Sequence, residues 1–343
     1  MYNNIVKYIK KLIIVSIPFF LFLVWYIILD PFEVIWHYDD YYEHRGVRLS
    51  LNQGYVGVSN FENHYEQFKW DSFIFGNSRS RYWEINDWEK FLPPHSRGYH
   101  LDAHGETMIG LLKRFEWLDK KNIPIKNALI CLDTDMLCKM ESSNEHIFMI
   151  APQLVNYKNY FSFQLTNFKV FCNYEFIKTC FTIWFSSNTK TDIADLITGE
   201  IFDYDYTKNQ ISLFPTEKKI EQGEYYTAEL VNKMFINKQY PDSISPKYIK
   251  EPQKQVLHKI ANIMEKHHTD YRVVINPQYN QIKMNPYDIK VLKNVFGENR
   301  VYDYSGVNKI THDYHNYYES SHYRSCAAKK IMKEIYKKIT KEV

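Results

Sequence analysis

The sequence has no excess charge of either sign, and it contains few of the residues that interrupt a chain. Its 343 residues include 43 Lys and Arg against 40 Asp and Glu, a formal net charge of +3. This near-balance leaves no basic surplus for gripping a nucleic-acid backbone, so we expect no nucleic-acid partner. With 11 glycines and 12 prolines, a collagen-like or linker-dominated chain is excluded.

Cysteines are also few, and their spacing excludes familiar patterns. Five are present, an odd number, so at least one thiol is free. No pair has the C-x-x-C spacing of zinc or redox sites. Cys172 and Cys180 can form a disulfide in an oxidising compartment, but the sequence does not decide whether they do.

Only one stretch is long and apolar enough to cross a membrane. Residues 12–29 carry no charge, and this length is at the lower end of what spans a hydrocarbon core. Three lysines precede the stretch and acidic residues follow it, which places residues 1–11 in the cytoplasm and the main domain outside. The alternatives are a cleaved signal peptide and a buried core helix. The run is longer than a usual signal core and no small-x-small cleavage site follows it, so we predict a single-pass anchor in the cytoplasmic membrane.

Buried strands alternate with helical patterns in the rest of the chain. Asp71–Gly76 and Asn127–Asp133 are short continuous apolar runs, and Thr107–Leu118 has apolar residues at helical spacing between them. This alternation predicts an α/β fold with a mostly parallel sheet. Later segments fit the same fold: predicted strands at 271–276 and 301–304, and predicted helices at 255–266 and from about residue 323.

The domain organisation follows from composition. Residues 30–69 are polar and aromatic with three glycines, which predicts an irregular lead-in. Residues 70–343 form the predicted α/β domain, with one helix starting within 79–91. Residues 146–255 have weak periodicity, and we interpret them as an insertion that covers the carboxyl edge of the sheet.

Ser78 is the first candidate for chemistry. It lies in Gly76–Ser80, where a buried strand turns toward a helix, and α/β folds bind ligands at this edge. Its backbone N–H at a helix start is suited to donating to an oxyanion. The alternative is that Ser78 simply caps the helix, and the hydroxyl is a poor nucleophile without a base.

His322 is the second candidate, because an acid precedes it at a useful spacing. Glu319 lies three residues before His322, just ahead of the last predicted helix. Such an acid can hold the histidine Nδ1–H and leave Nε2 free to take a proton from Ser78. Asp303 and Asp313 are fallback acids for the same role.

The segments around these residues resemble the SGNH (GDSL-like) hydrolases, and within them a membrane-anchored, exported group linked to the acylation of cell-envelope polysaccharides. The resemblance covers about two fifths of the chain, roughly residues 70–137 and 270–340. Phe73–Ser80 resembles the first block, whose serine is nucleophile and oxyanion donor, and Glu319–His322 resembles the last block. Gly105 resembles the second-block glycine, whose N–H completes the oxyanion hole.

The resemblance implies a flavodoxin-like three-layer domain and a function. The expected activity is that of a serine esterase or O-acyltransferase acting on a cell-envelope glycan through an acyl-serine intermediate. Its implied catalytic residues are Ser78, His322 and Glu319, and no metal or other cofactor is expected. The expected partners are the membrane, through residues 12–29, a glycan or acyl-donor substrate, and a membrane-embedded acyltransferase.

The chain departs from the family pattern in three places, and the last two departures favour a second hypothesis, a catalytically inactive scaffold or glycan-binding protein. Asn77 stands where the family has Asp, and Glu319 stands where the last block has Asp. The third-block Gly-x-Asn-Asp is absent, and its strand end carries Asp133 and Asp135. An ionised Asp133 cannot donate to an oxyanion, and losing one donor costs about 10²–10³ in rate.

Other polar groups have two interpretations each. Arg79 and Arg81 can bind an anionic substrate or pair with local acids. With Asn77, the carboxylates of Asp133 and Asp135 can line the substrate pocket, or they can cap the next turn. His267–His268 and the group His312, His315 and His322 invite a metal interpretation, but their spacing matches no structural zinc pattern.

Overall fold

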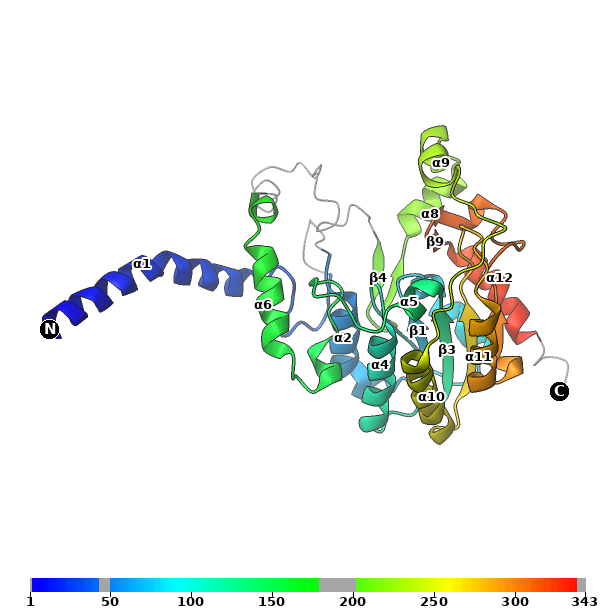
Figure 1. Ribbon diagram of the computed structural model, residues 1–343, viewed down its shortest axis with the longest axis horizontal. Coiled ribbons are helices and arrows are strands. Elements are labelled where there is room, and N and C mark those ends of the chain that lie inside the picture. The colour runs from blue at the N-terminus through cyan, green and yellow to red at the C-terminus, as the bar shows by residue number, and fades with distance from the viewer. Residues whose placement is uncertain (1, 43–49, 179–201, 338–343) are drawn as a thin grey trace. The chain divides into compact units, whose positions relative to one another are not determined.

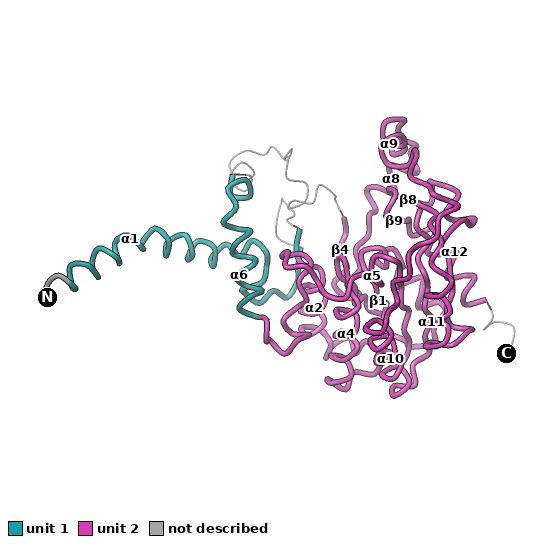
Figure 2. Tube along the Cα trace, viewed as in Figure 1, with its two compact units in different colours: residues 1–51, 160–199 teal, residues 52–159, 200–343 magenta. Residues whose placement is uncertain are grey.

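The computed structural model describes residues 2–42, 50–178 and 202–337. The chain divides into two compact units (Figure 2). One contains residues 1–51 and 160–199, and the other contains residues 52–159 and 200–343. Part of the predicted insertion therefore belongs with the amino-terminal unit.

The amino-terminal unit begins with the long apolar helix α1, Tyr2–Leu29. Its Ile5–Leu29 portion has a mean hydropathy of 2.8, and only 6% of its most apolar window is buried. Val15, in the middle, is 79% exposed. A helix that is apolar and mostly exposed fits a single-pass anchor or a signal sequence, and it confirms the predicted apolar helix at 12–29.

The second unit is built on a parallel sheet of five strands in the order β2-β1-β3-β6-β7. Figure 1 labels β1 and β3 of this sheet. Every neighbouring pair in this sheet is parallel. The strands are β1 Ser72–Gly76, β2 Gly98–Asp102, β3 Asn127–Leu132, β6 Asp270–Ile275 and β7 Val301–Asp303. Numbered within the sheet alone the order is 2-1-3-4-5, the doubly wound order whose direction reverses between β1 and β3. The predicted α/β fold is confirmed.

Helices cover both faces of this sheet, because side chains alternate along each buried strand. Phe75 stacks on Phe115 of α4 with ring centroids 4.1 Å apart, and it shares one face with its register partner Ile130. Ile74 points to the opposite face, together with Arg272, whose guanidinium lies over the Tyr336 ring of α12. The first face is covered by α2 Gln53–Phe68, α4 Met108–Lys120, α10 Glu251–Lys266 and α11 Pro286–Phe296, and the second by α3 Ile85–Trp88 and α12 Ser325–Tyr336.

The lead-in prediction for residues 30–69 is wrong in its second half. Residues 53–68 form α2, which Asn52 caps by accepting a hydrogen bond from Tyr55 N. Gly54 and Gly57 suggested chain breaks, but they are sites of close packing. A Cβ on Gly54 would lie 2.9 Å from a guanidinium nitrogen of Arg114, and one on Gly57 would lie 2.6 Å from the amide nitrogen of Asn209.

The helix predicted to start within residues 79–91 is not continuous. The chain forms three short helical pieces, at Ser80–Tyr82, Ile85–Trp88 and Glu89–Phe91. The first piece ends at Trp83, which adopts an extended backbone and is fully buried. Packing of this indole outweighs continuation of the helix.

Part of the predicted insertion meets the sheet at its edge strand and at the carboxyl end. The hairpin of β4 Asp203–Asp205 and β5 Gln210–Ser212 lies beside β2, where Asn209 donates to His100 O at 2.9 Å. Two helices follow, α8 Phe214–Glu221 and α9 Ala228–Met234. Glu217 of α8 pairs with Arg324 and accepts a hydrogen bond from Tyr318 at 2.5 Å. This segment therefore supports the chain that leads into α12.

The stacked pair of Phe75 and Phe115 gives a test of this core. Phe115 is fully buried between α4 and the sheet, so Phe115→Ala removes a large apolar side chain and leaves a cavity. We expect the free energy of unfolding to fall by about 3–5 kcal/mol. Denaturant unfolding of the full chain in detergent measures this change. Glu116→Ala on the outer side of α4 is the matched control and should change stability by less than about 0.5 kcal/mol; equal effects would contradict the assigned core.

Candidate active site

The site begins at the turn that follows β1. Gly76 is required there, because a Cβ would lie 2.6 Å from Cβ of Ser80 and 3.0 Å from the carbonyl of Cys131. Asn77 shapes the turn by accepting the backbone N–H of Arg79 on its side chain at 3.0 Å and that of Ser80 on its carbonyl at 2.9 Å. Ser78 is thus held at the carboxyl end of β1. It does not cap a helix, since Arg79 occupies the cap position of the short helical turn.

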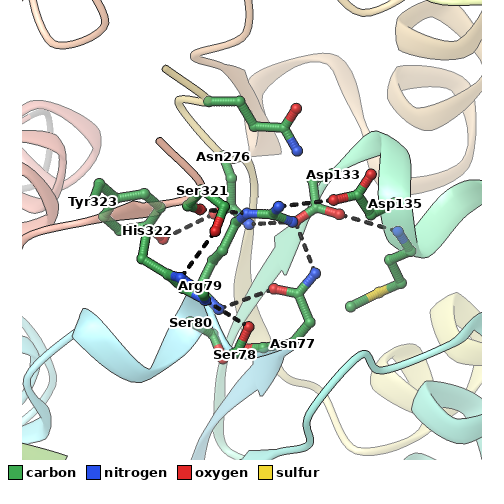
Figure 3. A network of polar contacts seen from close by, with 12 residues as sticks. Asn77, Ser78, Arg79, Ser80, Asp133, Asp135, Asn276, Ser321, His322 and Tyr323 are labelled. Atoms are coloured by element: carbon green, nitrogen blue, oxygen red, sulfur yellow. Dashed lines mark hydrogen bonds and ion pairs between the residues drawn. The ribbon is translucent and has the colours of Figure 1, made fainter. Parts of the chain in front are cut away.

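Ser78 and His322 meet although 244 positions separate them. The Ser78 Oγ lies 2.8 Å from Nε2 of His322 (Figure 3). The other ring nitrogen, Nδ1, is hydrogen-bonded to the carboxylate of Glu319. The three side chains therefore form the serine–histidine–acid relay that the sequence predicts, with each ring nitrogen facing the expected neighbour.

The acid of this relay is held by its own loop. Glu319 ends β8, Tyr317–Glu319, and His322 begins β9, His322–Tyr323. The carboxylate also accepts hydrogen bonds from the Ser321 hydroxyl at 2.6 Å and from the Ser321 N–H at 2.7 Å. Burial alone would raise the pKa of Glu319, but the hydrogen bond and charge of His322, together with the Ser321 bonds, lower it to about 2. The group is therefore an anion at neutral pH and a strong acceptor for the histidine.

Asp133 lies directly after β3 and is the buried hub of the site. Its side chain is 1% exposed. One oxygen accepts from Asn77 Nδ2 at 2.8 Å, Arg79 at 2.9 Å and Asn276 Nδ2 at 3.1 Å, and the other accepts from Met136 N at 3.0 Å. Burial would raise the pKa of Asp133, but the charge of Arg79 and these hydrogen bonds lower it. Asp133 thus stays ionised and is fully occupied by protein donors.

Arg79 ties three segments together through one guanidinium. Its two terminal nitrogens pair with Asp133 at 2.9 Å and with Asp135 at 2.7 Å. Its Nε donates to the carbonyl of Ser321 at 2.8 Å (Figure 3). Because Ser321 directly precedes His322, Arg79 fixes the histidine loop relative to the ends of β1 and β3.

The sequence does not predict a second series of buried hydrogen bonds, which joins Trp83, Tyr323 and Asn276. Tyr323 donates its hydroxyl hydrogen to Asn276 Oδ1 at 2.9 Å and accepts from the Trp83 indole at 2.6 Å. Asn276 in turn donates to Asp133. Asn276 directly follows the buried strand β6, so a polar residue at a strand end was the available signal. Tyr323 and Trp83 gave no such signal, because their pairing depends on the fold.

Gly105 lies on the loop after β2, the strand beside β1. Its φ is +53°, and a Cβ there would lie 3.0 Å from the ring of Phe148. Both the backbone conformation and the limited space therefore favour glycine. The loop is joined to the Ser78 turn by a hydrogen bond from Ala103 N to Gly76 O at 3.3 Å. Burial and the charge of Arg81 lower the pKa of the adjacent His104 well below its ordinary value, so this ring is neutral.

The remaining candidate groups have other partners. The fallback acid Asp303 pairs with Lys283 at 2.7 Å, and Asp313 pairs with His315 at 2.8 Å on the surface. Within residues 2–42, 50–178 and 202–337, no three His, Cys, Asp or Glu side chains are grouped to hold a metal ion. Cys172 is a free thiol in the structure, but Cys180 lies outside the described residues.

A cavity of about 330 Å³ lies away from Ser78. It is lined by residues that include Trp70, Arg97 and Gly98, where β2 begins. Ser78 follows the opposite, carboxyl end of the sheet.

No protein-family model and no curated protein sequence matches this chain. The fold that is shown is an α/β domain with a parallel sheet of five strands, preceded by one long apolar helix.

The buried and exposed acids of Arg79 make a matched pair for measuring stability. Asp133→Ala leaves a guanidinium and two buried amides without their acceptor, so we expect a loss of about 3–5 kcal/mol in the free energy of unfolding. Asp135→Ala removes the second carboxylate that pairs with Arg79. The Asp135 side chain is 53% exposed, so this change should cost less than about 1 kcal/mol. Thermal and denaturant unfolding compare the two variants, and similar losses would show that Asp133 is not the hub.

The lowered pKa of Glu319 predicts a pH-dependent stability. A carboxyl with pKa 4.5 when unfolded and about 2 when folded stabilises fully above pH 4.5 and loses that contribution as the pH falls toward 2. Between about pH 5 and about pH 2.5, wild type should lose roughly 1–2 kcal/mol more than Glu319→Gln, after allowance for partial exposure. Unfolding measured across this range tests the expectation, and parallel curves for the two proteins would refute it.

Proposed function

We propose that this protein is a membrane-anchored serine esterase or O-acyltransferase that acts on a cell-envelope glycan through an acyl-serine intermediate. The observation that carries the proposal is the relay of Ser78, His322 and Glu319, with 2.8 Å between the serine Oγ and the histidine Nε2. The resemblance of the same segments to SGNH hydrolases supports it. So does the location of Ser78 at the switch point of a doubly wound sheet, where such folds bind ligands.

The first half of the reaction forms the acyl-enzyme. Ser78 Oγ attacks the carbonyl carbon of an ester while its proton passes to Nε2 of His322. Glu319 holds the ring through Nδ1 and stabilises the imidazolium that forms. The carbon–oxygen bond of the ester then breaks, and the leaving alcohol takes the proton from His322.

The second half transfers the acyl group to an acceptor. His322 removes a proton from the acceptor hydroxyl, which attacks the acyl-serine carbonyl and releases Ser78 with its proton restored. Water as acceptor makes the enzyme an esterase, and a sugar hydroxyl makes it a transferase. The two activities use the same residues and differ only in the acceptor that reaches the site.

The developing negative charge on the carbonyl oxygen needs donors. We assign this role to the backbone N–H groups of Ser78 and Gly105, which lie on adjacent loops at the carboxyl edge of the sheet. Asp133 does not leave an uncompensated negative charge beside them, because Arg79 pairs with it and amide donors occupy its oxygens. Asn77, Arg79, Asp133 and Asp135 therefore act in this proposal as supports of the site, whereas the sequence placed them in a substrate pocket.

The apolar helix α1 indicates where in the cell the protein would act. An apolar α1 with lysines before it and acids after it suits a single-pass helix in the cytoplasmic membrane, with the α/β unit outside. An envelope glycan and an acyl donor that are both handled at the membrane surface would be within reach. A membrane-embedded acyltransferase is the partner that this arrangement would serve.

The second candidate function is an inactive glycan-binding scaffold. One observation favours it: the strand end that supplies an oxyanion amide in the SGNH pattern carries the ionised Asp133, all of whose hydrogen-bonding capacity is used within the protein. The two functions differ in one measurable property, the reactivity of Ser78.

Labelling with a fluorophosphonate probe tests that reactivity in the full chain. We expect wild type to be labelled at Ser78, and the rate to fall at least about 100-fold in Ser78→Ala and in His322→Ala, because the nucleophile or its base is lost. Mass spectrometry of the labelled peptide locates the adduct.

His315→Ala is the matched control for this experiment. His315 is also hydrogen-bonded to an acid, Asp313, but the pair is exposed on the surface. Its labelling should equal that of wild type. A folded wild type that takes up no label would overturn the esterase and favour the scaffold.

A further inference from the structure

Helix α6, Tyr160–Phe171, exposes large apolar side chains that water would not favour. It belongs to the amino-terminal unit, together with α1 (Figure 2). Phe161 is 80% exposed, and Leu165, one helical turn later, is 39% exposed. Tyr174, just beyond the helix, is 72% exposed. Exposed phenyl and leucyl surface costs about 25 cal/mol for each Å² that stays in water, so a covering partner is expected.

Phe161 and Leu165 share one side of α6 with Phe168, which packs on α1 and shows at what level the helix lies. Phe168 contacts Phe19, Phe22 and Tyr26 with ring centroids 6.4, 6.2 and 5.1 Å apart. Phe171 contacts Phe22 and Trp25, each at 5.1 Å. These contacts all fall between Phe19 and Tyr26, in the carboxyl-terminal half of α1.

The polar end of α1 is marked by Asp30. Its carboxylate accepts hydrogen bonds from the backbone N–H groups of Val34, Ile35 and Trp36 at 2.9–3.0 Å. Residues 19–26 precede Asp30 by four to eleven positions, which is about 6–17 Å along a helix. That is the depth of the headgroup boundary and outer acyl chains when α1 spans a bilayer.

We propose that α6 is a second membrane-contacting element, with Phe161 and Leu165 placed among the acyl chains of the outer leaflet. The inference rests on the anchoring role of α1 in the proposed function. The covering partner is lipid, because the exposed surface of α6 continues the apolar surface of α1, which lipid covers. Figure 1 shows α6 crossing the end of α1, as a helix lying in the membrane plane would. Lys169 is exposed on the same side and can extend its ammonium to the headgroups.

Photo-crosslinking of the full chain in vesicles tests this placement. The photoreactive analogue p-benzoylphenylalanine replaces Phe161, and in separate variants Phe19 or Tyr287. Phe19 lies within the apolar helix, and Tyr287 is an exposed aromatic on α11. The vesicles contain phosphatidylcholine and phosphatidylglycerol, and mass spectrometry identifies lipid adducts. We expect adducts at 161 and 19 in comparable yield, each at least about tenfold above the yield at 287.

The outcomes separate this inference from the proposals on which it builds. Lipid adducts at 19 without adducts at 161 overturn the inference and leave the anchor intact. Adducts at neither position overturn the anchor and the inference together. Crosslinking of position 161 to a second copy of the chain also overturns the inference, because protein and not lipid then covers this side of α6. Fluorophosphonate labelling of the same samples reports on the active site independently of all three results.

Discussion

The buried ion pair of Arg79 and Asp133 is the interaction on which the rest of the site depends. Moving two charges out of water is expensive, and the cost is offset only when the geometry is good and every remaining donor and acceptor is used. That condition is met here: Asp133 accepts hydrogen bonds from Asn77, Asn276 and Met136 as well as from Arg79. A pair of this kind contributes little net stability, but it permits few alternative arrangements of the chain around it.

The arrangement that it fixes involves three separate stretches of sequence. The turn after β1 carries the serine, the end of β3 carries the aspartate, and the hairpin of β8 and β9 carries the histidine. Arg79 bonds to the last two while belonging to the first. The distance between Ser78 and His322 is therefore set by a neighbouring residue that need not touch a substrate. Behind it, the bonds joining Trp83, Tyr323 and Asn276 hold the histidine strand from the buried side.

The elements with continuous or periodic apolar patterns could be predicted, and those that depend on partners could not. The sequence predicts β1, β3, β6 and β7, as well as α4 and α10. Strands buried on both faces appear as continuous apolar runs, and helices buried along one side show apolar residues at helical spacing. Strand β2 reads Gly-Tyr-His-Leu-Asp, and its polar His100 is buried with partners distant in sequence: its ring is hydrogen-bonded to the Trp83 carbonyl, and its backbone carbonyl accepts from Asn209. Helix α2 was misread for a similar reason, since Gly54 and Gly57 are packing residues whose neighbours are distant in sequence.

For the site, the order of predictability follows sequence distance. Short segments of sequence are enough to identify Glu319 and His322, from their spacing, and Ser78, from its position after a strand. The structure brings the three side chains together. From the sequence alone, an ionised Asp133 opposes the formation of an oxyanion. Its compensating partner Arg79 lies 54 positions away, and the sequence does not show that the two side chains pair. Asn276, Tyr323 and Trp83 were missed because each acquires its role only when β6, β9 and the segment after β1 are adjacent.

The separation of 244 positions between Ser78 and His322 has a consequence for how the protein is made. Synthesis delivers Ser78 early and His322 near the end of the chain. During most of its synthesis the chain therefore carries a Ser78 without His322, and an Asp133 without Asn276, the hydrogen-bond donor that follows β6. Long loop closure between such distant segments is slow relative to local helix formation. The contact between Ser78 and His322 therefore forms only after nearly the whole chain has been made, and a chain that ends before residue 322 lacks it.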